Sequence, residues 1–334
     1  MARHVNIPVF IPHLGCPNQC VFCNQRTISG VCEFRPEDFK KTVEEALSTV
    51  ESGAEVEIAF FGGSFTGIDR ELMLSLLKEA KGFVEGGRVH SIRCSTRPDY
   101  IDEEIIAILK EYGVNTVELG LQSCSDRVLL KSKRGHSRSD EIRACRLIAS
   151  SGIELVGQMM IGLPSSTIED EIETARFIIN SGAKAVRIYP TVVFHGTELA
   201  KMYKDGEYSP LSLDEAVCRS AAVLREFVGK DITVLRIGLC ASENLRSEET
   251  YLAGPNHSAL GELIFGEVYY GLIRELLLKK AEIGTEITLF VPKGCVSKVM
   301  GHGGKNKTRL VNEFGIRRLT VKEDGALLPY QIRI

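Results

Sequence analysis

Three cysteines lie close together in the stretch Gly15-Cys16-Pro17-Asn18-Gln19-Cys20-Val21-Phe22-Cys23. Three residues separate Cys16 from Cys20 and two separate Cys20 from Cys23, so one loop can bring all three thiols to a single metal centre. Iron-sulfur clusters are held by cysteine thiolates, and a four-iron cubane needs four ligands. Three cysteines therefore leave one iron open to another molecule, and chemistry is expected at that open position.

Two other interpretations of this loop are a zinc site and three unrelated buried thiols. Structural zinc sites usually close with four ligands, and no second CxxC or His pair follows nearby to complete one. The CxxxCxxC spacing, with Phe22 directly before the last cysteine, resembles the signature of the radical S-adenosylmethionine (radical SAM) superfamily. The resemblance implies a [4Fe-4S] cluster on the three cysteines, with the amino and carboxylate groups of SAM on the fourth iron.

The composition is that of an ordinary globular protein. Of the 334 residues, 25% are charged and 44% are apolar, and the formal net charge is -3; such a balance argues against disorder. Ten cysteines without a signal peptide favour a reducing cytoplasm, where thiols serve metals or hydrophobic cores. No apolar run approaches the ~18 residues needed to cross a membrane. We therefore expect a cytoplasmic protein that makes no use of a membrane.

Short apolar runs alternate with helical patterns along the first 240 residues. Residues 5–11 predict a strand that delivers the cysteine loop at its carboxyl end, and residues 36–53 predict the helix that follows. Six such units imply an α/β fold: a parallel sheet with right-handed crossovers, curled into a partial (β/α)6 barrel. The active site of such a barrel lies where the strands end. Further strands are predicted at 56–61, 89–94, 114–121, 153–161, 185–193 and 233–239, and further helices at 71–84, 102–112, 139–150, 168–180 and 213–228.

A pair of glycines follows the second predicted strand, in Gly62-Gly63-Ser64-Phe65-Thr66-Gly67. Without side chains, Gly62 and Gly63 allow the backbone to approach a ligand closely, although a glycine pair after a strand is often a plain turn. One strand after the cysteine loop, the pair resembles the glycine motif with which radical SAM enzymes hold the methionine end of SAM. The usual third residue of that motif is acidic or Thr, where this chain has Ser64.

Motifs at the ends of later strands extend the resemblance. The runs 94–101, 117–123 and 133–136 look like the radical SAM domain of the Elongator catalytic subunit. More distantly, the layout is similar to oxygen-independent coproporphyrinogen oxidase. The resemblance covers about residues 5–240, and the order and spacing of several motifs make it specific.

This resemblance implies four further SAM contacts. Gln122 and Arg134 match polar residues that contact SAM in those families. Ser95 matches a ribose-binding position that is often Glu, and Gln158 matches a position that is Asp or His elsewhere, so both are departures from the pattern. The alternative for all four side chains is a hydrogen bond within the barrel or on its surface, because polar residues are common at loop ends.

Other reactive side chains are sparse. Cys240 ends the seventh predicted strand and is a candidate catalytic residue that would donate a hydrogen atom or form an adduct. A buried, inert thiol is the simpler interpretation, because reactivity needs exposure and a lowered pKa. Glu118 and His195 are expected to be structural, and Asp99 is expected to cap the helix that follows residue 101.

The carboxy-terminal part predicts a cover followed by a small module. Residues 241–285 predict a loop and a long helix that cover the open edge of a barrel spanning residues 1–240. Residues 286–334 predict a strand, a short helix, the turn Gly301-His302-Gly303-Gly304, a second helix and two strands, the last at 329–334. This order resembles a KH-like α+β RNA-binding module, in which the GxxG turn clamps a nucleic-acid backbone.

Charge supports RNA binding independently of the turn. Residues 293–322 hold eight Lys and Arg residues against Glu313 alone, a net +7, which leaves -10 for the rest of the chain. Neutralising phosphates dominates the affinity for nucleic acids, so Lys305, Lys307 and Arg309 beside the turn are predicted RNA contacts. The alternative is a solvated basic face, with glycine turns that need no RNA.

The function predicted from these features is a radical SAM enzyme that modifies RNA, with tRNA as the expected class and flavodoxin or ferredoxin as electron donor. In the Elongator catalytic subunit an acetyltransferase domain follows the barrel, whereas this chain stops at Ile334. The same uridine modification is therefore not assumed. The alternatives are a radical SAM enzyme for a small molecule such as a tetrapyrrole, and a non-catalytic RNA-binding protein stabilised by an iron-sulfur cluster.

Overall fold

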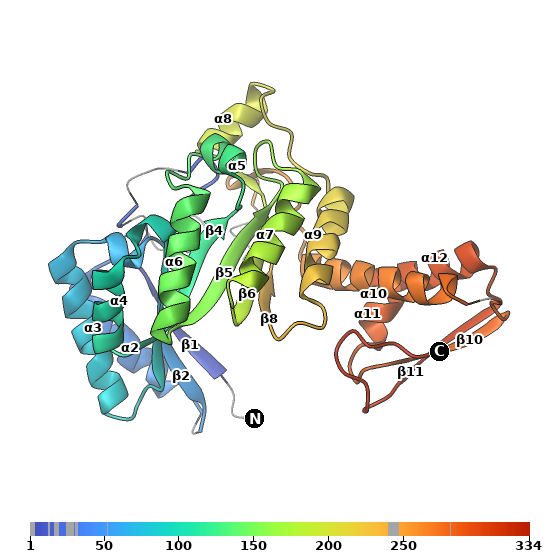
Figure 1. Ribbon diagram of the computed structural model, residues 1–334, viewed down its shortest axis with the longest axis horizontal. Helices are drawn as coiled ribbons and strands as arrows, with labels where there is room; N and C mark the ends of the chain where they lie inside the picture. Colours follow the sequence, from blue (N-terminus) through green and yellow to red (C-terminus); the bar gives the residue numbers. More distant parts are fainter. Residues whose placement is uncertain are drawn as a thin grey trace.

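The computed structural model describes residues 4–12, 14–16, 20–24, 30, 33–51, 53–239, 247–280 and 282–334. Figure 1 shows a large body built on one sheet and a smaller module beside it. The long helix α10 (Leu260–Leu278) runs from the first to the second. The two parts therefore share one element.

Seven parallel strands form the central sheet, in the order β1-β2-β3-β4-β5-β6-β8. Because each strand pairs with the next one of the sheet in the chain, the sheet winds in one direction and curls into a half-barrel. This confirms the predicted partial barrel, and the run predicted at 233–239 joins it as the seventh strand. The strands are β1 (His4–Phe10), β2 (Glu55–Phe61), β3 (Ser91–Thr96), β4 (Val114–Gln122), β5 (Glu154–Ile161), β6 (Ala185–Pro190) and β8 (Thr233–Ile237).

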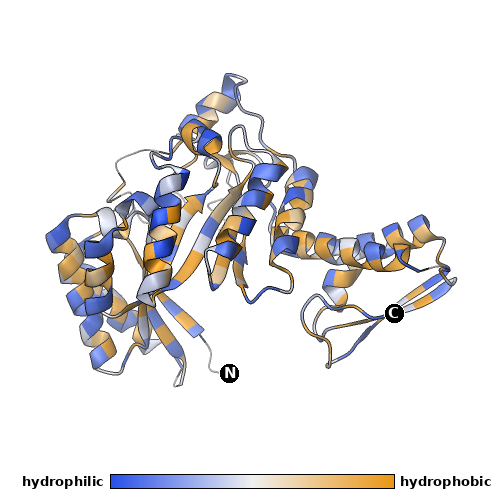
Figure 2. Ribbon diagram, viewed as in Figure 1, coloured by the Kyte–Doolittle hydropathy of each residue, from blue (hydrophilic) through white to orange (hydrophobic). Residues whose placement is uncertain are grey.

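Helices cover one face of the sheet (Figure 1). Alternate strand residues such as Ile58, Phe60 and Ile92 are completely buried against them in the main hydrophobic core. Figure 2 shows apolar residues along the strands and polar residues on the outer sides of these helices. The covering helices are α2 (Phe39–Ser48), α3 (Arg70–Glu85), α4 (Glu103–Glu111), α6 (Arg138–Ser151), α7 (Ile168–Asn180) and α9 (Leu213–Phe227).

Local sequence explains where these helices begin. α6, α7 and α9 each start with a capping box, in which the cap side chain and an acidic residue three positions later bond to each other's backbone N–H. The three caps are Ser137, Thr167 and Ser212. Such signals lie within four residues of sequence, so the predicted starts differ little from the observed ones.

Several short elements were not predicted. The helices α5 (Asp126–Lys131) and α8 (Glu198–Lys204) are too short to show a helical period. The segment predicted as one strand at 185–193 is divided: β6 ends at Pro190, and β7 (Val193–Phe194) pairs with β9 (Tyr251–Ala253) outside the sheet. These additions all lie beyond the carboxyl ends of the strands, where the site is expected.

The module has the predicted order of strand, helix, turn, helix and strand. β10 (Glu286–Val291) pairs in parallel with β11 (Arg318–Glu323), and between them lie α11 (Val296–Met300) and α12 (Lys305–Phe314). The strand predicted at 329–334 is wrong. A single bridge between Phe290 and Arg333 is formed there, because the chain between turns at residues 324–331 and reaches β10 only near its end.

The long helix α10 belongs to two hydrophobic cores. Leu260, Ile264 and Val268 pack into the core of the half-barrel. Tyr269 and Ile273, in the second half of the helix, pack with the module. The division of the chain at residues 240 and 285 stays a prediction. The packing shows that α10, which lies between these two boundaries, contributes to the cores of both the half-barrel and the module.

No helix in the described part of the chain is long and apolar enough to cross a membrane.

Candidate active site at the carboxyl ends of the strands

The cysteine loop leaves β1 at the carboxyl edge of the sheet and is held there by two neighbouring segments. The N–H of Val21 donates to the carbonyl of Ser132, at 3.2 Å, and the N–H of Leu199 donates to the carbonyl of Val21, at 2.8 Å. Ser132 directly follows α5 and Leu199 lies in α8. The two helices that the sequence pattern did not reveal therefore position the loop. Cys20 is buried, whereas Cys16 and Cys23 are partly exposed.

Glycines seat the cysteine loop on the turn that follows β2. Gly15 has a φ of 73°, and a Cβ there would lie 2.2 Å from the carbonyl oxygen of Ser64. A Cβ on Gly63 would lie 2.5 Å from the carbonyl oxygen of Leu14, and Gly62 has a φ of 97°. Glycine is therefore required for the two loops to approach each other. The contact of Gly62 and Gly63 with SAM stays a prediction.

Two of the cysteine sulfurs have hydrogen-bonding partners. Arg134 Nη1 donates to Cys20 Sγ at 3.1 Å, while its Nη2 donates to the carbonyl of Gly120 at 2.5 Å. Cys16 Sγ lies 3.4 Å from the hydroxyl of Ser64. Hydrogen bonds to the ligand atoms of a metal site orient those ligands. Arg134, predicted to contact SAM, is therefore placed against a predicted cluster ligand.

The chemistry of these residues fits an iron-sulfur cluster. No three His, Cys, Asp or Glu side chains lie in coordinating geometry among the described residues, which omit 17–19 of the loop. The fit rests instead on the donor set: three thiols on one loop, with polar donors beside two of the sulfurs. Arg134 Nε and Gln122 Oε1 are also buried with no hydrogen-bond partner in the described structure. Such atoms normally find a partner, and a polar ligand would supply one.

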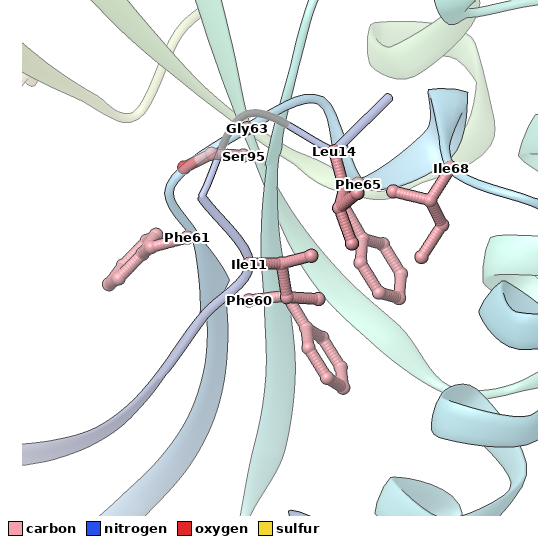
Figure 3. Close-up of a pocket in the computed structure, with 8 residues that line it drawn as sticks. All are labelled: Ile11, Leu14, Phe60, Phe61, Gly63, Phe65, Ile68 and Ser95. Carbon is pink, nitrogen blue, oxygen red and sulfur yellow. The ribbon is translucent and has the colours of Figure 1, made fainter. Parts of the chain in front are cut away.

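The other predicted SAM contacts divide into two groups. Gln122 has a left-handed φ of 70° at an irregularity of β4, and its amide lies with Arg134 beside Gly120. Ser95 lines a small pocket with Gly63, and Figure 3 shows Ser95 and Phe61 on one side of the strands, with Ile11, Phe60, Phe65 and Ile68 on the other. Gln158 differs, because its amide donates to Glu118 at 2.8 Å.

A buried charge network forms the inner face of the half-barrel. Glu118 accepts from Arg93, at 2.9 Å, and from Arg187, at 2.8 and 2.9 Å, and Arg93 also donates to Glu57 at 2.7 Å. Burial opposes the ionisation of Glu118, but hydrogen bonds and charge from Arg187 and Arg93 outweigh burial and lower its pKa. Glu118 is therefore a paired structural carboxylate, and Gln158 is part of the same network.

A second arginine approaches the cysteine loop from β3. Arg97 is buried and makes a two-pronged pair with Asp99, at 2.9 and 2.8 Å. Burial disfavours its charge, but Asp99, Cys20 and Cys16 nearby outweigh this effect and raise the pKa of Arg97. The predicted cap role of Asp99 is therefore wrong: Asp102 caps α4, and Asp99 pairs with the arginine. Arg97 was not predicted as a site residue, although its place directly after a predicted strand was a usable signal.

A buried His–Glu pair lies behind these arginines. His136 Nε2 and Glu141 Oε1 are 3.1 Å apart, and both side chains are fully buried. Burial, together with the positive charge of Arg134 and Arg97, lowers the pKa of His136 to about 3. Burial also raises the pKa of Glu141 well above its usual value. The two shifts favour the neutral forms of both side chains, with the proton on the carboxyl group.

Two further candidates from the sequence are Cys240 and His195. Cys240 is outside the described residues, so its catalytic role stays a prediction. His195 lies next to β7, where its backbone N–H donates to the carbonyl of Thr250 at 2.9 Å. The structural role expected for the side chain of His195 stays a prediction.

The glycine turn of the module presents exposed backbone. Gly303 and Gly304 have φ values of 61° and 76°, and a Cβ on either would meet nothing within 4 Å. Gly301 is different, because a Cβ there would lie 2.7 Å from the side chain of Asn306. The exposed His302 completes the turn. Gly301 therefore serves packing, while the backbone at 303–304 is open to a partner.

The three predicted RNA contacts after the turn differ in their surroundings. Lys307 is exposed, and Lys305 is exposed and pairs with the exposed Asp214 at 3.6 Å. Arg309 instead pairs with Glu267 at 2.5 and 3.1 Å and lies 3.5 Å above the ring of Tyr270. Arg309 is therefore paired with residues of α10, whereas the side chains of Lys305 and Lys307 face solvent.

Comparison with known proteins identifies the family. Residues 10–178 match the radical SAM superfamily, and residues 183–269 match the radical SAM C-terminal domain. The chain belongs to the radical SAM superfamily. It is therefore a radical SAM enzyme, as predicted, and the family implies a [4Fe-4S] cluster and SAM.

Relatives of the chain include tRNA uridine(34) acetyltransferases. A tRNA uridine(34) acetyltransferase of Methanocaldococcus infernus is 33% identical over 49% of this chain and 34% of the relative, so the chain spans about a third of that protein. An uncharacterized protein of Methanocaldococcus jannaschii is 32% identical over 63% of this chain and 68% of the relative. Mouse Elongator complex protein 3 is 28% identical over 54% of this chain and 38% of the relative.

Solved structures share the fold. The archaeal Elp3 of Methanocaldococcus infernus superposes with a TM-score of 0.65 at 24% identity, covering 83% of this chain and 64% of that one. Methylornithine synthase superposes with a TM-score of 0.53 at 17% identity, covering 77% and 76% of the two chains. Together with the sequence match to Elongator complex protein 3, the first of these confirms the predicted likeness to the Elongator catalytic subunit.

Proposed function

We propose that this enzyme modifies RNA, with tRNA as the substrate class, through a cluster held by Cys16, Cys20 and Cys23. The observation that carries the proposal is the cysteine loop at the carboxyl edge of the sheet, with Arg134 on one of its sulfurs. The names of the relatives support the substrate class: a tRNA uridine(34) acetyltransferase and a putative methylthiotransferase are among them. The exposed turn at 301–304 and its lysines support RNA independently.

The residues of this chain bind and orient the reactants. When bound, the cluster and SAM supply a 5'-deoxyadenosyl radical by one-electron cleavage of SAM, with the electron from a flavodoxin or ferredoxin. Arg134 donates to the sulfur of Cys20 and fixes its orientation, and hydrogen bonds to cluster sulfurs tune the reduction potential. The amide of Gln122 and the hydroxyl of Ser95 lie at the same edge and would bind the polar groups of SAM.

The inner face of the half-barrel keeps these groups in place. Glu118, Arg93 and Arg187 are paired with one another, so none of them competes for the proton or charge of a substrate. Gln158 is held by Glu118 with its carbonyl oxygen uncommitted to that bond. We infer that this network orients the inner face and takes no part in proton transfer.

Nucleosides from the tRNA of a deletion strain test this proposal. One modified nucleoside should disappear in the deletion strain and return when the wild-type gene is restored, but not when the gene carries Cys20→Ala. The purified, cluster-loaded protein should then restore that nucleoside on the deficient tRNA, given SAM and a reductant. Identical nucleosides in the two strains would overturn the RNA substrate. Cleavage of SAM by the same preparation would leave a small-molecule substrate as the explanation.

A further inference from the structure

A second pocket opens at the carboxyl edge of the sheet, beyond β6 and β8. It encloses about 430 Å³ of space, part of it open to solvent. Its walls come from the ends of these two strands and from the segment 255–261 that leads into α10. The predicted SAM contacts are not among its lining residues. Its lining includes Pro190, Val192, His257, Ser258 and Leu260.

The wall formed by 255–261 is fixed to the strand ends. Gly254 has a φ of 104°, and a Cβ there would lie 3.0 Å from the carbonyl oxygen of Thr191. The carbonyl of Gly254 accepts from the hydroxyl of Tyr251 at 2.7 Å. Just before it, β9 pairs with β7. Only glycine allows the chain to pass so close to the segment after β6, and the wall that follows is held over the strand ends.

His257 connects this pocket with the glycine turn of the module. Its Nδ1 accepts from the backbone N–H of Ala259 at 3.1 Å. The neutral ring therefore carries its proton on Nε2, which is a donor with no partner in the described parts of the chain. The ring of His302 lies edge-on to that of His257, with centroids 6.1 Å apart and planes at 83°. The wall of the pocket and the turn at 301–304 are thus direct neighbours.

Contacts between the module and α10 hold the glycine turn next to the pocket. The side-chain amide of Asn306, just after the turn, donates to the carbonyl of Gly266 in α10 at 2.7 Å. Lys298 lies 4.7 Å from the ring centre of Phe265, and Arg309 is paired with Glu267. These contacts join both helices that flank the turn to the start and middle of α10. The turn and the pocket therefore form one continuous surface.

We propose that this pocket receives one nucleotide of an RNA strand whose backbone crosses the turn at 301–304. The inference rests on the proposed function and adds where the substrate lies. Pro190, Val192 and Leu260 offer apolar walls for the faces of a base, and single-stranded RNA is commonly bound by burying splayed bases. The Nε2–H of His257 is a donor for a base carbonyl or a phosphate oxygen. The basic lysines beside the turn hold the next phosphates.

The position of the pocket would bring a bound nucleotide to the predicted active site. It opens at the same edge of the sheet as the cysteine loop, where substrates of α/β barrels are bound. A nucleotide bound there is held at the edge where the radical is generated, while the neighbouring backbone is held by the module. The module would therefore bind the backbone of the RNA strand, and the pocket would hold one of its bases near the cysteine loop.

Photocrosslinking tests the placement. Wild-type protein, loaded with cluster and SAM, is mixed with tRNA that carries 4-thiouridine in place of uridine, irradiated and mapped by mass spectrometry. We expect crosslinks in 254–261 and in 301–307. Ser258→Phe, which fills the pocket, should lower the yield in 254–261 about tenfold while tRNA affinity changes less than about threefold, because most of the binding energy comes from phosphates. Ser150→Phe, an exposed site on α6, is the matched control and should change neither.

Each other outcome has a definite meaning. Crosslinks confined to 301–307 would overturn the pocket assignment and leave the proposed function standing. Crosslinks in 254–261 that appear without SAM and vanish with it would assign the pocket to the cofactor and overturn the inference as well. The absence of any crosslink, together with no measurable tRNA binding, would overturn the RNA substrate itself and the inference with it.

Discussion

Two cationic regions of this molecule have opposite surroundings. On the inner face of the half-barrel, Arg93 and Arg187 are enclosed and each is paired with a carboxylate. On the module, Lys305 and Lys307 are exposed, and the carboxylate that pairs with Lys305, that of Asp214, is exposed as well. A buried charge must be paired or it destabilises the fold, whereas an exposed charge can remain available for a polyanion. Burial and partners, more than the sign of the charge, therefore separate structural cations from binding cations.

The largest effect should come from removing the sulfur next to Arg134. Cys20→Ala takes away one predicted cluster ligand, and we expect loss of both the cluster and SAM cleavage. Iron and sulfide content and the yield of 5'-deoxyadenosine measure this. Cys218→Ala, at an exposed cysteine of α9, is the control and should retain both. A full cluster in the Cys20 variant would contradict the ligand assignment.

Breaking the buried charge network around Glu118 should destabilise the protein strongly. Glu118→Ala leaves Arg93 and Arg187 without their shared carboxylate, and the loss should be about 3–5 kcal/mol of unfolding free energy. Glu226→Ala, which breaks the ion pair with the exposed Arg176, is the control and should cost at most ~1 kcal/mol. Urea unfolding measures both. Equal losses of unfolding free energy in the two variants would mean that burial does not decide how much an ion pair contributes to stability.

Reversing the exposed lysines should weaken RNA binding without affecting the fold. The double variant Lys305→Glu with Lys307→Glu should lose about tenfold or more in tRNA affinity, and the dependence of affinity on salt should become shallower, by roughly 0.7 in log–log slope for each lost phosphate contact. Thermal midpoints should stay close to wild type. The same reversal at Lys40 and Lys41 on α2 is the control, and an equal loss there would indicate nonspecific charge.

The smallest effect concerns the pH dependence of stability at the buried pair His136–Glu141. Burial lowers the pKa of His136 from 6.5 to about 3, so this shift reduces stability as the pH falls below 6.5. Burial raises the pKa of Glu141 above 4.5, so this shift reduces stability as the pH rises above 4.5, until the folded carboxyl group ionises. Between pH 4.5 and 6.5 the two effects oppose each other, and at higher pH only the effect of Glu141 remains, with a slope of up to about 1.4 kcal/mol per pH unit.

The variant Glu141→Gln isolates this contribution. Without the carboxyl group the fall above pH 6.5 should disappear. A fall should instead begin as the pH drops below 6.5, because the unfolded histidine gains a proton that the buried ring, with its pKa lowered to about 3, does not. Thermal midpoints from pH 5 to pH 8 measure the difference. Wild-type and variant profiles of the same shape would show that the folded pair does not keep the proton above pH 6.5.

The sequence predicted the features that are local in the chain. The strands that alternate with helices, the cysteine loop and the glycine turn all follow from spacing within a few residues. The pairing of Gln158 with Glu118 and of Arg134 with Cys20 could not be predicted this way. Those contacts depend on strand register and on loops that meet only in the folded sheet.

The wrong assignment of Asp99 has the same origin. Asp99 has the side chain of a helix cap, but Asp102 lies at the right position for α4, and Asp99 pairs with Arg97. The pairing of Arg309 with Glu267 also depends on packing, and the contact of Arg309 with RNA stays a prediction. Residue type alone predicts what a side chain is able to do, and the packing decides which partner it meets.

The shared helix α10 has a consequence for how such a protein arises in evolution. Its second half supplies Tyr269 and Ile273 to the core of the module, so a gene cut at residue 285 would leave the rest of the module without one wall of its core. Transfer of the RNA-binding part to another enzyme would have to carry α10 as well. During synthesis, likewise, the last edge of the barrel can be covered only after α10 has been made. The module, whose strands follow α10 in the chain, can complete its core only later.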